Sequence, residues 1–173
     1  MWMATRAFWL CVTIAWPVHA EINGSYFFDS ERGLELNFPA KWRLTEQVPY
    51  PGFLLLAVPP KDAVRLTVVY QETSRPLSNV VLENRTALSA IGFTIGSAGA
   101  TQVDVLALRI SLPGGEYELL QAYRFHEGIV YILTLGGAPK VLKKYESTFW
   151  NLVQGMKLMS RNSPSDQYNR SPL

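Results

Sequence analysis

The stretch VDVLALRISLPGGEYELLQAYRFHEGIVYILTL, residues 103–135, decides the fold because it holds three apolar strands in succession. Two glycine-containing turns separate these strands, one at PGGE and one at HEG. Apolar runs of this length, joined by such turns, are typical of antiparallel β-hairpins. The stretch therefore predicts a three-stranded antiparallel meander at the centre of the domain.

The first turn of this stretch fixes the register of the first hairpin. Gly114 and Gly115 are placed at its centre because glycine accepts the left-handed backbone that tight turns need. Every cross-strand pair that results is apolar: Leu112 with Tyr117, Ile110 with Leu119, and Leu106 with Tyr123. Pro113 lacks an N–H group, so the loop can open to four residues without changing these pairs.

The second turn admits two registers. A two-residue turn, 127–128, would pair Phe125 with Val130. A three-residue turn, 126–128, would pair Phe125 with Ile129, continue the apolar face of the first hairpin and place a glycine at the left-handed position. A slip of one residue turns every side chain to the other face of the sheet. The apolar pattern favours the three-residue turn.

The second turn also bears on catalysis. His126 is the one histidine beyond the first twenty residues, and the three-residue turn makes it a solvated loop residue. A Ser-His-Asp mechanism needs a histidine positioned by an acid, and the sequence names no such partner. Glu116 and Glu118 share a strand face and leave a carboxylate-dependent hydrolase as an alternative, although Glu118 is also expected to pair with Arg109 or Arg124. We expect no enzymatic activity and no catalytic residue.

Both faces of the predicted sheet are apolar, so both need a cover. The face opposite the first set of pairs carries Val105, Ala107, Leu120, Ala122, Val130 and Ile132. Helical spacing predicts one helix over 77–92, with Ser78 as N-cap and Gly92 just beyond its end, and a second helix over 140–156. The predicted fold class is α+β: an antiparallel β-sheet with helices packed on both faces, an α/β/α sandwich.

The apolar stripes of the two helices can be read from the same spacing. The first stripe comprises Leu77, Val80, Val81, Ala87, Leu88 and Ile91, and the second comprises Leu142, Tyr145, Phe149, Leu152, Val153 and Met156. Further strands precede the first helix. SYFFD and GLELNFP predict a hairpin over 25–39, while FLLLAV, 53–58, predicts a strand buried on both faces that pairs with VRLTVVY, 64–70.

The N-terminal segment MWMATRAFWLCVTIAWPVHA has the layout of a secretory signal peptide, with one positive charge, a short apolar run and small or apolar residues before a cleavage site after Ala20. The run is shorter than the roughly 20 residues that a membrane span needs, although an uncleaved anchor stays an alternative. We expect a signal peptide over 1–20, one domain over 21–159 and a polar, disordered tail over 160–173.

Composition restricts the chemistry. The 173 residues include 16 basic and 14 acidic residues, and this near-neutral balance predicts no binding to nucleic acid or to an anionic membrane. The single cysteine, Cys11, lies in the signal segment, so the mature chain has no disulfide and no thiolate ligand. Metal-ligand clusters and phosphate-binding glycine loops are also missing from the sequence. We therefore expect no metal and no cofactor.

Two segments resemble PsbP-like domains. FFDSERGLELNFPAKWRL is similar to the opening hairpin of that family, with a strand that ends at a proline and a tryptophan shortly after it, and EGIVYILTLGG with KKYESTFWNLVQGMKL resembles its closing strand and C-terminal helix. The order of elements agrees over roughly residues 25–158. The wider fold includes DcrB-like periplasmic proteins. The resemblance implies an α/β/α sandwich and an accessory role in binding, and it carries over no functional residue.

The one candidate recognition surface is VPYPGF together with an upstream tryptophan. Trp42, Tyr50 and Phe53 are its partner-binding candidates, because aromatic residues are enriched at interface centres. The alternative interpretation is that these rings cap the core. We expect an exported, periplasmic or lumenal, monomeric module that binds an unknown protein partner. A carrier of small apolar ligands, with a cavity under Tyr117, Tyr123 and Tyr131, is the alternative.

Overall fold

The computed structural model describes residues 20–46, 51–61, 63–98 and 105–160. Within them, the predicted meander is formed by β8 (Val105–Ser111), β9 (Glu118–His126) and β10 (Ile129–Gly137). The register of the first hairpin is confirmed, since Ile110 pairs with Leu119. The N–H group of Leu112 donates to the carbonyl of Tyr117 at 3.0 Å and closes a four-residue loop, as Pro113 allows.

The predicted register of the second hairpin is wrong. Val130 pairs with Phe125, so the turn has two residues, Glu127 and Gly128, and not three. Their φ angles are 45° and 80°, the left-handed backbone of a tight hairpin turn whose twist matches that of the strands. β10 is apolar on both faces, so both registers bury apolar pairs and the apolar pattern could not separate them. The geometry of the turn decides instead.

The shorter turn also changes the position of His126. It is the last residue of β9 and pairs with Ile129, and its side chain is 28% exposed. Its Nε2 atom is buried, lies 4.0 Å from a carboxylate oxygen of Glu127 and makes no hydrogen bond within the described residues. The expected solvated loop residue is therefore a partly buried residue at the end of a strand.

The meander is the centre of a seven-stranded antiparallel sheet with the order β4-β5-β6-β10-β9-β8-β7. Its remaining strands are β4 (Arg43–Thr45), β5 (Phe53–Val58), β6 (Arg65–Glu72) and β7 (Thr94–Ser97). The predicted pairing of the two apolar runs is confirmed as β5 with β6. β6 then pairs with β10, which joins the two hairpins into one sheet.

A second, four-stranded sheet has the order β1-β2-β3-β11. Its strands are β1 (Ala20–Asn23), β2 (Tyr26–Asp29), β3 (Leu34–Asn37) and β11 (Lys157–Leu158). The predicted hairpin is β2 with β3, and one of its faces is buried, with Leu34 and Leu36 at 0% and Phe38 at 5% exposure. β1 and β11 are too short for an alternating pattern, so the second sheet was not predicted.

The two helices are α1 (Leu77–Ala90) and α2 (Pro139–Gly155). α1 begins after Pro76 without a side-chain cap, so the predicted cap at Ser78 is wrong. Gly92 follows it with a φ of 91°, as expected for the residue after a helix. Ile91 is 68% exposed and does not join the apolar stripe, because it lies beyond the last helical turn.

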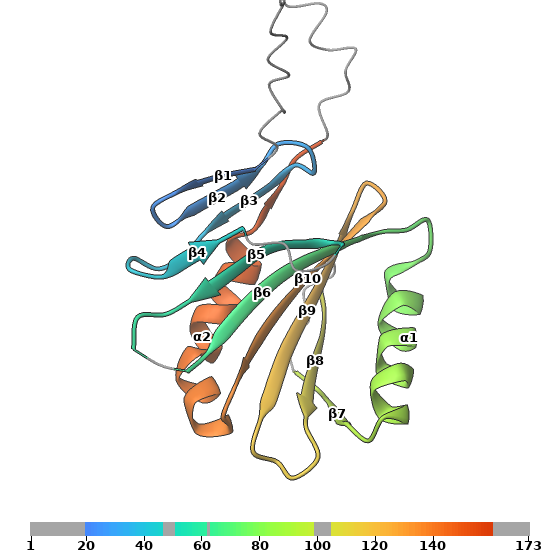
Figure 1. Ribbon diagram of the computed structural model, residues 1–173. Coiled ribbons are helices and arrows are strands. Elements are labelled where there is room, and N and C mark those ends of the chain that lie inside the picture. Colours follow the sequence, from blue (N-terminus) through green and yellow to red (C-terminus); the bar gives the residue numbers. More distant parts are fainter. Residues whose placement is uncertain (1–19, 47–50, 62, 99–104, 161–173) are drawn as a thin grey trace, which may run out of the picture.

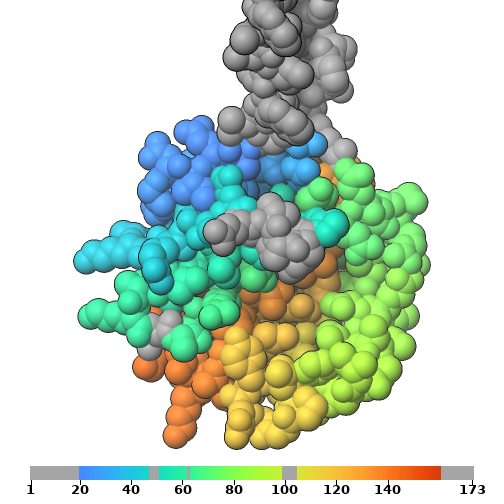
Figure 2. Space-filling model, viewed as in Figure 1, coloured from blue at the N-terminus to red at the C-terminus, as the bar shows by residue number. Residues whose placement is uncertain are grey.

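The helices cover the larger sheet unequally. α2 contacts β9 and β10 and packs with Leu120 and Ala122, whereas the main contacts of α1 are with β7, β8 and β9, and it packs with Tyr123 and with Val130 of β10. Figure 1 shows α2 behind the sheet and α1 beside β8. The smaller sheet contacts α2 through β3, and Arg32, in the turn between β2 and β3, bonds to Tyr70 of β6 and Tyr131 of β10. In the view of Figure 2 the smaller sheet, in blue, lies directly above the segments of β4 and β5. The described residues therefore form an α+β fold with two antiparallel sheets and two helices, and the predicted cover of both faces by helices is not confirmed.

The ends of the predicted domain lie at the limits of the described chain. The signal segment up to residue 19 and the tail from residue 161 fall outside the described residues. Neither α1 nor α2, the helices of the described part, is long and apolar enough to cross a bilayer.

Candidate functional site

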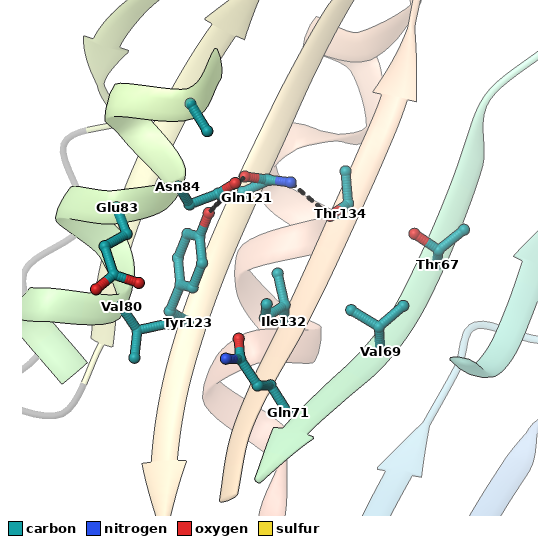
Figure 3. A pocket seen from close by; sticks show the side chains of 11 residues that line it. Thr67, Val69, Gln71, Val80, Glu83, Asn84, Gln121, Tyr123, Ile132 and Thr134 are labelled. Carbon is teal, nitrogen blue, oxygen red and sulfur yellow. Dashed lines mark hydrogen bonds between the residues drawn. The ribbon is translucent and has the colours of Figure 1, made fainter. Parts of the chain in front are cut away.

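A cavity of about 540 Å³ lies between α1 and the larger sheet, over parts of β9, β10 and β6. We call it the α1 groove (Figure 3). Its lining is drawn from one helix and three strands: Thr67, Val69, Gln71, Val80, Glu83, Asn84, Ala87, Gln121, Tyr123, Ile132 and Thr134.

The floor of the groove contains a polar row that crosses three strands. Gln121 of β9 pairs with Thr134 of β10, and Thr134 pairs with Thr67 of β6. All three point to the same face because paired residues of adjacent strands share a face. The row is flanked by Leu108 on β8 and Leu56 on β5, so its hydrogen-bonding groups are confined to the three central strands.

A second row lies beside the polar row, two residues further along each strand. Tyr123 of β9 pairs with Ile132 of β10, and Ile132 pairs with Val69 of β6. This apolar row and the polar row face the same side because side chains alternate along a strand. Ile132 and Val69 are half-buried, whereas Tyr123 is fully buried beneath α1. The floor therefore presents one hydrogen-bonding strip and one hydrocarbon strip.

α1 supplies one wall of the groove. Val80, Asn84 and Ala87 lie at helical spacing on the same side of the helix and line the cavity. Asn84 links this wall to the floor, because its Nδ2 donates to Oε1 of Gln121 at 3.2 Å and also to the hydroxyl of Tyr123. The wall is therefore held in place by polar contacts as well as by the packing of Val80, which is 4% exposed.

A continuous chain of hydrogen bonds runs from α1 to β10. The hydroxyl of Tyr123 donates to Oε1 of Gln121 at 2.6 Å, and Nε2 of Gln121 donates to Oγ1 of Thr134 at 3.2 Å. Burial of the Tyr123 phenol raises its pKa to about 12, although the hydrogen bond from Asn84 acts in the opposite direction. The phenol is therefore neutral at physiological pH and remains a hydrogen-bond donor.

The groove has little ionic character. Glu83 is the one acidic residue among the eleven lining residues, and its carboxylate pairs with Arg75 at the rim, where both side chains are largely exposed. The other lining side chains are amides, hydroxyls and aliphatic groups. Such a lining can hold a ligand by neutral hydrogen bonds and apolar contact, whereas it offers no paired nucleophile and base.

The predicted partner-binding residues lie elsewhere. Trp42 is 7% exposed, with its ring 6.1 Å from that of Phe38 and 5.9 Å from that of Tyr145. Phe53 is also 7% exposed, at the start of β5. Their burial agrees with the interpretation that these rings cap the core. Tyr50 lies outside the described residues.

The two glutamates considered for catalysis are not brought together over a cavity. Glu118 pairs with Arg109 at 3.2 Å, as expected, and Arg109 also pairs with Glu146 of α2 at 2.6 Å. Glu116 is exposed in the turn between β8 and β9. Across the described residues, no three His, Cys, Asp or Glu side chains gather closely enough to hold a metal ion.

The cavity expected under three tyrosines is found under only one of them. Tyr123 lines the α1 groove, whereas Tyr131 is buried in the core beneath α2, where its hydroxyl donates to the carbonyl of Arg32. Tyr117 lies instead against Gly136. The corrected register of the second hairpin accounts for this separation, since it turns Tyr131 to the face opposite Tyr123.

The polar row was missed by sequence reasoning. Thr67, Gln121 and Thr134 each have an apolar residue on both sides in the sequence, and that is the signal that could have identified them. Their meeting in one row depends on the cross-strand register.

Comparison with known proteins identifies the fold. No protein-family model and no curated protein matches the sequence. The solution structure of cyanobacterial PsbP (CyanoP) from Synechocystis sp. PCC 6803 is similar, with a TM-score of 0.59 and 15% identity, over 78% of this chain and 91% of that one. The crystal structure of LpqN, involved in cell envelope biogenesis of Mycobacterium tuberculosis, is also similar, with a TM-score of 0.50 and 15% identity, over 73% of this chain and 83% of that one. At such identities the likeness shows the fold alone, and that fold is PsbP-like, as the sequence resemblance implied.

Proposed function

We propose that this chain is an exported accessory module that works by non-covalent binding, without catalysis, and that the α1 groove is its binding site. The observation that carries the proposal is the lining of the groove, in which neutral amide and hydroxyl groups converge with aliphatic side chains over about 540 Å³. Cavities of roughly 300–1,000 Å³ with a few placed polar groups are typical of small-ligand sites.

The fold and the N-terminal segment support the accessory and exported parts of the proposal. One structural neighbour is a PsbP and the other is involved in cell envelope biogenesis, which fits a module that serves a larger system outside the cytoplasm. The signal-peptide pattern of residues 1–20 fits the same location. Fold likeness by itself is analogy, so the groove carries the functional argument.

A protein partner is the second candidate, favoured by the accessory character of the fold. In that case a side chain of the partner would occupy the groove. A small molecule and a peptide side chain need the same chemistry to bind this lining, since both must match its neutral hydrogen-bonding groups and its apolar strip.

The experiment is a thermal-shift screen of the full chain with neutral metabolites and lipids, repeated with a variant that fills the groove. Ala87→Trp places an indole over the floor from α1, and Ala90→Trp is the matched control, because Ala90 is exposed on the same helix and does not line the groove. A ligand at 100 times its Kd stabilises the folded state by about 2.7 kcal/mol. We expect stabilising compounds to lose their effect in Ala87→Trp and to keep it in Ala90→Trp. Equal shifts in all three proteins, or no stabilising compound at all, would contradict the proposal.

A further inference from the structure

We propose that the α1 groove selects an uncharged, elongated amphipathic molecule that lies across the strands, with its polar groups on the polar row and its hydrocarbon on the apolar row. This inference rests on the proposed function, because it names the class of ligand for the same site. It follows from the geometry of the two rows, their hydrogen-bonding capacity and the placement of charge around them.

The rows set the size and direction of the ligand. Each row runs from β9 through β10 to β6, perpendicular to the strands. Adjacent strands lie about 4.8 Å apart, so each row is roughly 10 Å long, and the two-residue offset separates the rows by roughly 7 Å. Because α1 covers the Tyr123 end of the apolar row, a matching ligand carries its oxygens over the polar row and a hydrocarbon group beside them, over Ile132 and Val69.

The hydrogen bonds of the polar row define what the ligand must offer. Oγ1 of Thr134 accepts a hydrogen bond from Gln121, so the hydroxyl proton of Thr134 is available to an acceptor on the ligand. The hydroxyl of Thr67, next in the row, makes no hydrogen bond to the described residues and can donate or accept. The ligand thus needs a carbonyl or hydroxyl oxygen over β10 and a second oxygen, such as a hydroxyl, over β6.

The charges around the groove disfavour an ionised ligand. The floor contains no ionisable group except the Tyr123 phenol, which is neutral at physiological pH. A charged group placed over the floor would lose hydration without gaining a partner of opposite charge. At the rim, Glu83 and Arg75 pair with each other, so their opposite charges offset and favour an ion of neither sign. The site therefore discriminates against ions of either sign.

The test compares three probes that share a ten-carbon chain: 1-monodecanoylglycerol, which is neutral, decanoate, which is anionic, and decyltrimethylammonium, which is cationic. Isothermal titration calorimetry of the full chain at pH 8, below the micelle concentration of each probe, measures their Kd values. We expect the monoglyceride, whose ester and hydroxyl oxygens can meet the polar row, to bind at least tenfold more tightly than either ion.

Two isosteric variants assign the preference to the polar row. Thr67→Val and Thr134→Val remove one hydroxyl each while keeping the shape of the side chain. Each is expected to raise the Kd for monodecanoylglycerol at least fivefold. Thr94→Val is the matched control, because Thr94 is an exposed threonine on β7, outside the groove. Far-UV circular dichroism confirms that each variant folds.

The outcomes separate this inference from the proposed function. Equal affinity for the three probes, no binding of the monoglyceride, or monoglyceride binding that both valine variants leave unchanged would overturn the ligand class. The binding role of the groove would survive such a result if Ala87→Trp still abolished stabilisation by compounds from the screen. Both the binding role of the groove and this inference would be contradicted if Ala87→Trp bound those compounds as the wild type does.

Discussion

The two faces of the larger sheet are built from the same strands but differ in how deeply their side chains are buried. On the face beneath α2, Leu120, Leu133 and Leu135 are at most 1% exposed. On the face toward α1, the neighbouring residues Gln121 and Ile132 are only half-buried and border the groove. Stability is concentrated on the α2 face, which leaves the α1 face free to keep an open, partly polar surface.

The difference arises from the two helices. α2 buries Leu142, Phe149, Leu152 and Val153 along a single stripe and contacts the middle of the sheet. α1 buries only Val80 and Val81, while Leu82 is 60% exposed. A helix with a narrow apolar stripe covers less of the sheet, so Ile132 and Thr134 of β10 and the facing part of β6 remain only half-buried on its side, although Val130 of β10 is covered.

The largest expected effect compares two adjacent residues of β10 that point to opposite faces. Leu133→Ala should lower the free energy of unfolding by about 3–4 kcal/mol, because it leaves a cavity in the core beneath α2, where Leu133 is 1% exposed. Ile132→Ala should cost about 1 kcal/mol, since Ile132 already borders the open groove. Urea denaturation measures both. Equal losses for the two variants would break the comparison.

The α2 face also anchors the second sheet, and the next prediction tests that connection. Asp29 is 0% exposed and pairs with Arg32 at 2.9 Å, while Arg32 donates to the hydroxyl of Tyr70 at 3.1 Å. Asp29→Ala should lower the free energy of unfolding by about 3 kcal/mol, because it removes the buried carboxylate partner of a largely buried guanidinium.

The matched control for this prediction is the second carboxylate on the same arginine. Glu31 lies 3.1 Å from Arg32 and is 47% exposed, so Glu31→Ala should change the free energy of unfolding by less than about 0.5 kcal/mol. Chemical denaturation at pH 7 measures the two losses. Similar losses from Asp29→Ala and Glu31→Ala would show that burial of the ion pair does not stabilise the junction between the sheets.

Most strands and both helices could be predicted because their apolar residues repeat with the period of the element. The groove could not be predicted from the sequence, because it depends on the register of one hairpin, β9 with β10. In the three-residue turn, Thr134 would pair with Leu120, and Thr134 and Gln121 would point to opposite faces. In the observed two-residue turn, Thr134 pairs with Gln121, and the polar row is formed. A strand that is apolar on both faces lets either register bury its side chains, so its pattern carries no information on this choice.

On the α1 face, the buried phenol of Tyr123 predicts a dependence of stability on high pH. Its pKa is raised to about 12 in the folded state, whereas an unfolded tyrosine titrates near pH 10. The unfolded chain therefore loses this proton first, and the stabilisation is complete below pH 10 and lost as the pH rises toward 12, by about 2–3 kcal/mol.

Tyr123→Phe isolates this contribution. The variant should be less stable at pH 8 by about 1–2 kcal/mol, because Asn84 and Gln121 each lose a hydrogen-bond partner. The difference from the wild type should shrink, or change sign, between pH 10 and pH 12 in urea denaturation. A constant difference over that range would mean that the phenol is not protected by burial.

The smallest expected effect concerns the turn that assigns residues of β10 to one face or the other. Glu127 adopts a φ of 45°, which a glutamate accepts poorly and an asparagine accepts well, and Asn-Gly is the preferred pair for this two-residue turn. Glu127→Asn should therefore stabilise the chain by about 0.5–1 kcal/mol in urea denaturation. Gly128→Ala, the control at a φ of 80°, should destabilise it by a similar amount or more, because alanine resists that backbone. A loss of stability from Glu127→Asn would contradict the two-residue turn, and with it the register that brings Gln121 and Thr134 together in the floor of the groove.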